Sequence, residues 1–156
     1  MSHLTHSTVS SMTLAGRARR VLAWLDRFPH TVLAIPLRLA LATVFWNSAM
    51  AKLANWESAL YLFREDYNVP LIPAEPAAYV AVSIELVAPV LLMLGLATRP
   101  VALVLLGMTT LIQVFVYPQA WPTHIQWAAM LLVLLARGPG KLSIDWLIRR
   151  RVLGAD

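Results

Sequence analysis

The chain has 156 residues, of which 59% are hydrophobic and only 13% are charged, with a formal net charge of +5 at pH 7. Soluble domains carry about a quarter charged residues, so this composition predicts a protein whose main solvent is lipid. The absence of cysteine excludes disulfides, thiolate metal sites, covalent haem attachment and iron–sulfur ligation by the chain's own residues. The basic residues flank hydrophobic runs and form no stripe with aromatics, so nucleic acid is not an expected partner.

The beginning of the chain is first polar and then amphipathic. Residues 1–13 are rich in Ser and Thr, and we expect them to be disordered. From residue 14 to 28 the apolar side chains recur at helical spacing, with Arg17, Arg20 and Arg27 beside the stripe or behind it. This pattern predicts an amphipathic helix that lies on an anionic membrane surface.

Four apolar stretches follow. The length of the first suits a bilayer core of about 30 Å, whereas the fourth is short. Pro36 falls in the first turn of the first stretch, where its missing N–H is tolerated. In the long connection 54–76, Asn55 can cap a short helix, and a tight turn at 98–100 separates the second and third stretches. We expect membrane spans at about residues 35–53, 77–97, 101–117 and 122–136.

These elements predict an all-α fold, an integral membrane four-helix bundle with an N-terminal amphipathic interfacial helix. We expect a single domain over 14–147 and a basic tail over 148–156. Basic residues concentrate before the first span, at Arg99 and in the tail, whereas the connection 54–76 carries four acidic residues and one basic residue. Because basic loops face the cytoplasm, we expect both termini to be cytoplasmic.

Few polar side chains interrupt the predicted spans. A charge at a helix centre in hydrocarbon costs at least about 2.5–3.5 kcal/mol, so each of them needs a reason. At about 1.5 Å per residue, several fall at similar depths in the outer half of the membrane. We therefore predict one polar cluster, shared by all four helices and formed by Asn47, Lys52, Glu85, Gln113, His124 and Gln126.

Lys52 and Glu85 carry opposite charges at matching depth, so Lys52 can neutralise Glu85. Pro89 clashes with the carbonyl four residues earlier, which is that of Glu85, and predicts a kink there. Two interpretations stay open: a structural ion pair that holds the bundle together, or a site that handles protons or a ligand. A metal ion is the least favoured occupant.

Two further polar residues are interpreted separately. Arg38 lies about one turn inside the cytoplasmic end of its span, and we expect it to extend to the lipid headgroups. His124 has no partner for two-histidine haem ligation, because His30, the other histidine near a span, lies at the opposite membrane face. Haem is therefore not expected, and no nucleotide or phosphate motif points to another cofactor.

Three segments resemble a known family. They are RLALATVFWNSAMAKL, IELVAPVLLMLGLATRP and ARGPGKLSIDWL. Together they resemble the DoxX family of small four-helix bacterial membrane proteins, over about residues 35–147. Ala49 and Gln126 depart from the family pattern, in which glycine and an acidic residue are usual. Besides Lys52 and Glu85, the motif residues carried over are Arg38, Gly138, Pro139, Gly140, Ser143 and Asp145.

The resemblance implies a bacterial inner-membrane protein connected to redox chemistry. It favours a membrane subunit of a quinone-linked oxidoreductase, or of a metal or sulfur stress system, with protein partners in a membrane redox complex. A non-catalytic anchor or assembly factor and a small transporter acting as a homo-oligomer stay open, as does whether the chain is an enzyme. Quinone is the cofactor that the resemblance leaves open. For the tail motif we favour a structural role, in which residues 138–140 end a helix and Ser143 and Asp145 cap or tether the tail.

Overall fold

The computed structural model describes residues 14–67 and 72–154, and the expectation for residues 1–13 lies outside this part of the chain. Within the described residues every regular element is a helix. In chain order the helices are α1 (Leu14–Asp26), α2 (His30–Ala54), α3 (Trp56–Glu65), α4 (Ala74–Leu94), α5 (Thr98–Leu111), the π-helix η1 (Ile112–Val116), the 3₁₀-helix η2 (Pro118–Ala120), α6 (Trp121–Arg137) and α7 (Ile144–Leu153).

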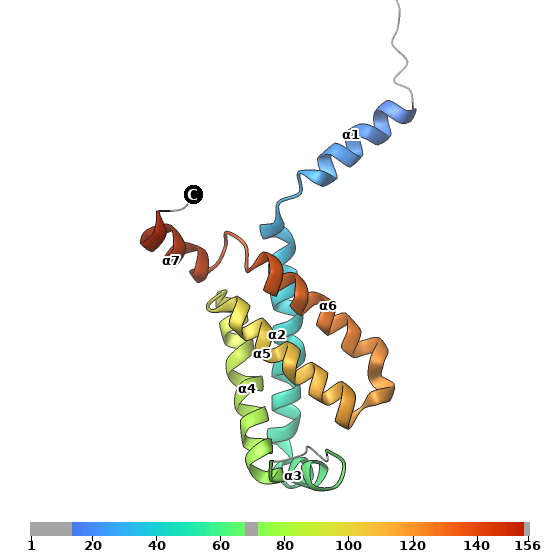
Figure 1. Cartoon of the computed structure of the whole chain (residues 1–156), viewed down its shortest axis with the longest axis vertical. Coiled ribbons are helices and arrows are strands. Elements are labelled where there is room, and N and C mark those ends of the chain that lie inside the picture. Colours follow the sequence, from blue (N-terminus) through green and yellow to red (C-terminus); the bar gives the residue numbers. More distant parts are fainter. Residues whose placement is uncertain (1–13, 68–71, 155–156) are drawn as a thin grey trace, which may run out of the picture.

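Two helix pairs form the body of the molecule (Figure 1). α2 packs most extensively against α4, and α5 packs most extensively against α6. α3 lies at one end of the body, against α2 and α4, and α7 projects from the other end. We call the α7 end the basic end, because it carries Arg99, Arg137 and Lys141, and the α3 end the acidic end, because it carries Glu57 and Glu65.

The core lies where the two pairs meet. It consists of apolar side chains from α2, α4, α5 and α6, with alanines between the larger residues. Small residues let helix backbones approach closely, which is how helices associate in lipid. The buried members are Ala34, Leu41, Ala42, Phe45, Ala88, Leu92, Val101, Ala102, Leu105, Leu131 and Leu134.

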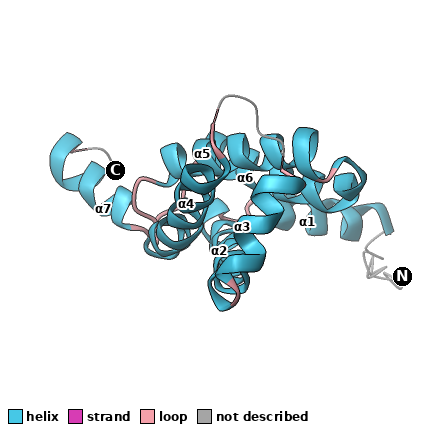
Figure 2. Cartoon of the chain, turned by 90° about the horizontal axis from the view of Figure 1, so that it is seen from below, coloured by secondary structure: helices cyan, strands magenta, loops and turns pink. Residues whose placement is uncertain are grey.

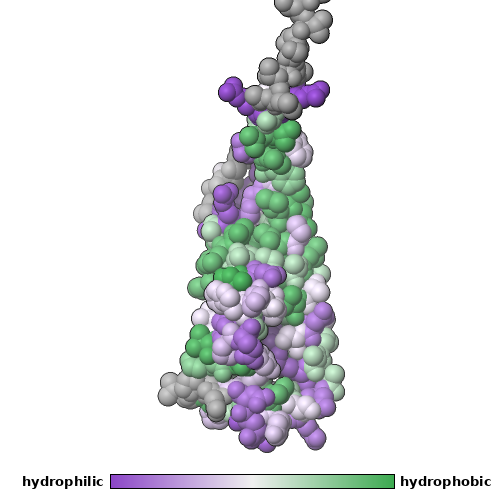
Figure 3. Space-filling view, turned by 90° about the vertical axis from the view of Figure 1, so that its right-hand side faces the viewer, coloured by the Kyte–Doolittle hydropathy of each residue, from purple (hydrophilic) through white to green (hydrophobic). Residues whose placement is uncertain are grey.

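The outer surface is also strongly apolar. Large side chains such as Val87, Leu103 and Leu132 are more than half exposed. Figure 3 shows hydrophobic residues along much of the flank, with hydrophilic ones at the top and more frequent toward the lower end. The segments His30–Ala54, Ala74–Leu94 and Thr98–Val116 are long and apolar enough to cross a membrane. Because extensive exposed apolar surface marks contact with lipid, this is the architecture of a membrane protein.

Several element boundaries differ from the sequence-based expectations. α2 begins at His30, ahead of the expected start at residue 35, so Pro36 lies inside the helix and not in its first turn. Thr98, Arg99 and Pro100 form the first turn of α5, and the connection that they were expected to make is made by residues 95–97. The predicted boundary between domain and tail at 147/148 falls inside α7.

The cap of the short helix α3 is as predicted, whereas the fourth predicted span is shorter than the other three. The side-chain oxygen of Asn55 accepts the Ser58 N–H at 3.0 Å, which confirms the predicted cap of the short helix α3. α6 occupies the expected fourth span, but its 17 residues cover only about 25 Å, and it is not among the three segments above. A fourth membrane span, and the surface position of α1, stay predictions.

α4 ends in a Schellman motif at Gly95. This residue has a φ of 64°, the Leu96 N–H donates to the Leu91 carbonyl at 2.9 Å, and the Gly95 N–H donates to the Leu92 carbonyl at 3.1 Å. A Cβ on Gly95 would lie 2.5 Å from the Cβ of Ser143. Glycine is therefore required here both by the backbone conformation and by the close approach of the tail.

Gly95→Ala should lower the free energy of unfolding by about 1–3 kcal/mol, because alanine would be held in the left-handed region and would displace Ser143. Equilibrium unfolding of the purified protein in mixed detergent micelles measures this loss. Gly107→Ala is the matched control, since an added Cβ there has no neighbour within 4 Å. Equal stability of the two variants would contradict this account of the α4 terminus.

Candidate functional site

A buried ion pair joins α2 to α4. Lys52 Nζ donates to both carboxylate oxygens of Glu85, at 2.8 and 2.9 Å. The Glu85 side chain is 1% exposed and that of Lys52 is 16% exposed. The sequence predicted this contact from matching depth, and the structure makes it.

Ser48 completes the contact, although sequence analysis missed it. Its hydroxyl accepts from Lys52 Nζ at 2.8 Å and donates to Glu85 Oε1 at 3.0 Å. Ser48 lies four residues before Lys52, and residues at this spacing share one face of a helix, so the spacing was the available signal. We call Ser48, Lys52 and Glu85 the charged cluster. It has no net charge, and its charges are paired and hydrogen-bonded, as burial requires.

Pro89 lies buried inside α4, four residues after Glu85. Because proline has no N–H, the Glu85 carbonyl lacks its usual helical partner. The helix nevertheless continues to Leu94. The predicted kink at this position stays a prediction.

His124 and Gln113 form a second polar contact, between α6 and η1. The Gln113 side-chain nitrogen donates to the Pro118 carbonyl at 2.7 Å, so its oxygen faces His124 Nδ1, also at 2.7 Å. An amide oxygen can only accept, so Nδ1 carries the proton that it donates to Gln113. In the neutral ring this leaves Nε2 as an acceptor, and Nε2 has no hydrogen-bond partner among the described residues.

A cavity of about 490 Å³ lies between α4 and α5, and both polar contacts reach it. We call it the α4–α5 cavity. The whole charged cluster and His124 line it, whereas most of its remaining wall is apolar. Gly107 contributes open space on the α5 side. Its apolar lining includes Val80, Ile84, Leu103, Val104 and Leu111.

Aromatic residues from the acidic end line the same cavity. Tyr67, just after α3, contacts the rings of Phe63 and Tyr117, with centroids 4.5 and 6.0 Å away. Burial raises the pKa of Tyr67 above its ordinary value, and the neighbouring Tyr117 adds to the effect. Tyr67 therefore stays a neutral phenol at physiological pH, able to donate or accept one hydrogen bond.

The structure divides the predicted cluster of six residues. Lys52 and Glu85 form one contact, Gln113 and His124 form another, and the α4–α5 cavity connects the two. Asn47 and Gln126 are exposed and join neither contact. Asn47 lies next to Ser48, and Gln126 lies two residues after His124. Because successive residues of a helix are rotated by about 100°, Asn47 and Gln126 point to other sides of their helices. The prediction of one cluster among all four helices is corrected accordingly.

Arg38 does not extend to the headgroups as predicted. It is buried, 5% exposed, and its guanidinium donates to carbonyls from two parts of the chain. Two of them, on Leu92 and Met93, belong to the last turn of α4. The other two, on Pro139 and Leu142, belong to residues 138–143 between α6 and α7, which we call the tail loop. The last carbonyls of a helix lack partners within it, and a guanidinium offers five donors. Arg38 thus caps α4 and ties the tail to it.

Asp145 and Ser143 hold the tail from the other side. The Asp145 carboxylate accepts the N–H groups of Ala97 and Thr98, at 2.7 and 2.8 Å, at the start of α5. The Ser143 hydroxyl accepts the Trp146 N–H and so caps α7. Carboxylates are favourable at a helix N-terminus. We call Arg38, Ser143 and Asp145, with the backbone groups they bind, the basic-end clasp.

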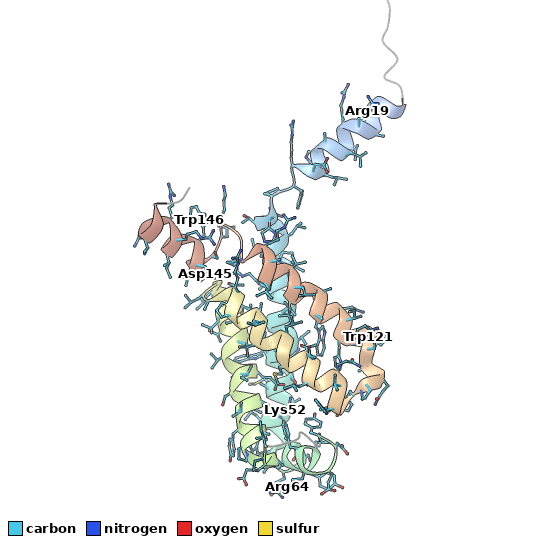
Figure 4. The ribbon with its side chains drawn as sticks, viewed as in Figure 1. Arg19, Lys52, Arg64, Trp121, Asp145 and Trp146 are labelled. Atoms are coloured by element: carbon cyan, nitrogen blue, oxygen red, sulfur yellow. The ribbon has the colours of Figure 1, made fainter. Side chains whose placement is uncertain are left out.

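Gly138, Pro139 and Gly140, at the start of the tail loop, also hold the tail against the helices. Gly138 has a φ of 79° just after α6, and its carbonyl lies 2.9 Å from His30 Nε2. A Cβ on Gly140 would lie 2.8 Å from the Thr31 backbone, while Pro139 supplies a carbonyl to Arg38. Figure 4 shows that Asp145 and Lys52 lie toward opposite ends of the helices, so the clasp is separate from the cavity.

The helices and the buried polar contacts together define a small helical membrane protein with a cavity between its helices. The chain matches the sequence model of the DoxX family over residues 33–118, a segment that includes Arg38, Lys52, Glu85 and Gln113 but not the tail loop. It is 34% identical over 127 residues to an uncharacterised protein of Haemophilus influenzae, covering 73% of this chain and 82% of that protein. No solved structure matches it. The chain belongs to the DoxX family.

The charged cluster generates a stability prediction. Lys52→Met should lower the free energy of unfolding by about 3–5 kcal/mol, because it leaves a buried carboxylate without its cation. Adding Glu85→Leu should restore most of this loss, since an apolar pair can replace a buried ion pair at little cost. Unfolding in mixed micelles measures both.

Lys141→Met is the control for loss of a lysine, because this side chain is exposed. If the double variant loses as much stability as Lys52→Met and Glu85→Leu lose together when measured singly, Lys52 and Glu85 do not act as a pair.

Proposed function

We propose that this protein is a quinone-binding membrane subunit of an oxidoreductase system. The observation that carries the proposal is the α4–α5 cavity, an apolar space between membrane helices with a charged cluster at its wall. Its volume of about 490 Å³ lies within the range of about 300–1,000 Å³ that small-molecule sites occupy. A lipid-soluble ring with polar oxygens matches such a wall.

The position of the cavity favours a ligand that arrives through the lipid. Val80, Leu103, Val104 and Leu111 line it and are also exposed on the outer surface. The cavity thus continues into the surface that faces the hydrocarbon. A water-soluble substrate would have to leave water to reach it, whereas a quinone is already dissolved in the bilayer.

The polar side chains fit the two oxygens of a quinone. Lys52 Nζ directs its three N–H groups at Ser48 and Glu85, and it would move one of them to a carbonyl oxygen of the ring. His124 Nε2 is an acceptor for the hydroxyl of the reduced form. Reduction of the quinone takes two electrons and two protons and yields the quinol. The two protons come from water outside the membrane. Glu85 and His124 Nε2, which hold no proton in the resting site, would each take up one and pass it to an oxygen of the ring. The electrons come from a redox centre of a partner protein, and the chain itself contributes the site.

The proposal includes the arrangement in the membrane. α6 is the fourth span beside α5, and α1 lies on the surface with apolar side chains such as Val21, Leu22 and Trp24, which are exposed, in the headgroup region. Both termini face the cytoplasm of a bacterial inner membrane. The basic residues at the α7 end support this orientation.

Gly107→Leu should block the cavity without disturbing the fold, because open space surrounds this position. We expect it to lower the amount of quinone that stays bound through purification by about tenfold, which corresponds to about 1.4 kcal/mol of lost affinity. Extraction and mass spectrometry of quinones per mole of protein measure the effect.

Ala129→Leu is the matched control, since Ala129 is an exposed residue of α6 that does not line the cavity. Equal quinone in both variants would refute binding in the α4–α5 cavity. Wild-type protein that retains no quinone but captures a soluble partner would instead favour the anchoring function.

A further inference from the structure

α7 exposes an apolar stripe flanked by arginines. Ile144, Ile148 and Val152 follow one another at a spacing of four residues and so lie along one side of the helix. Ile148 is 48% exposed and Val152 is 73% exposed. At about 100° per residue, Arg149 and Arg151 fall on either side of this stripe.

The opposite side of α7 has a different character. Arg150 and Trp146 lie there, with the guanidinium carbon 5.3 Å from the centre of the indole ring. The helix therefore has one apolar side with an arginine at each edge, and Leu147, which is 50% exposed, lies beyond Arg151 outside the stripe. This is the pattern of a helix that lies at a membrane interface.

The attachment of α7 sets the direction in which the stripe faces. Asp145 reaches the first N–H groups of α5, and its own N–H donates to the Gly95 carbonyl at 2.9 Å. Viewed along the axis of α7, the centre of the stripe is rotated by only about 60° from the position of Asp145. It therefore lies on the half of α7 that faces the end of a membrane-spanning helix, and Figure 2 shows α7 projecting outward past the other helices.

We propose that α7 lies on the bilayer surface at the basic end and binds anionic phospholipid. Ile144, Ile148 and Val152 enter the boundary between headgroups and acyl chains, and Arg149 and Arg151 bind the lipid phosphates. Burial in lipid removes the stripe from water, and the arginine charges complement anionic headgroups. This surface is separate from the α4–α5 cavity and does not depend on what the cavity binds.

The natural lack of cysteine allows a direct test in the full chain. Ile148→Cys and Arg150→Cys, each carrying a nitroxide spin label, are compared in nanodiscs of phosphatidylcholine with and without phosphatidylglycerol. We expect the label of Ile148→Cys to collide more with oxygen and less with a water-soluble nickel chelate than the label of Arg150→Cys. This difference should increase when phosphatidylglycerol is present.

Val152→Cys is a second reporter on the stripe, in case one labelled variant folds poorly. Arg149→Gln combined with Arg151→Gln should abolish the effect of phosphatidylglycerol on the label of Ile148→Cys. Equal exposure of the labels of Ile148→Cys and Arg150→Cys to the nickel chelate would overturn the proposal. Protection of the stripe label from oxygen as well as from the nickel chelate would also overturn it, because burial against a second copy or another protein excludes both reagents, whereas hydrocarbon dissolves oxygen.

Discussion

The ion pair between Lys52 and Glu85 is the constraint on which the middle of the structure depends. Two opposite charges in hydrocarbon are tolerable only together, so each fixes the position of the other, and Ser48 satisfies both. The pair therefore joins α2 to α4 at a defined register. It also gives the wall of an otherwise apolar cavity a donor and a carboxylate. The same contact that stabilises the bundle thus makes the cavity suitable for a ligand with polar oxygens.

At the basic end, charged side chains bind backbone groups at the ends of two helices. The last carbonyls of α4 and the first N–H groups of α5 have no partners within their helices. Arg38 binds the former and also reaches the tail loop, and Asp145, in the first turn of α7, binds the latter. Polar backbone groups near the membrane boundary are thereby satisfied by side chains from distant parts of the chain. The clasp holds the helices together at one end, while the cavity opens between α4 and α5 elsewhere.

The sequence predicted the features that depend on the depth of a residue in the membrane. It did not predict which side of a helix faces the interior, nor contacts between residues far apart in the sequence. Lys52 and Glu85 could be paired because depth follows from residue count, and the short α3 could be placed because Asn55 is a local signal. Asn47 and Gln126 could not be excluded, since the side of a helix that faces the interior depends on packing. Arg38 was misplaced because its partners, in α4 and the tail loop, lie far away in the sequence. The early start of α2 likewise accompanies a contact between His30 and Gly138.

The charge state of Glu85 in lipid tests the central claim most directly. Infrared difference spectroscopy between wild-type protein and Glu85→Gln, reconstituted in bilayers at neutral pH, isolates the absorption of this one side chain. The account predicts carboxylate bands and no carbonyl band of a protonated acid, together with a shift of the carboxylate bands in Lys52→Met. A protonated Glu85 in the wild-type protein would contradict the ion pair and, with it, the proposed origin of both the helix register and the ligand site.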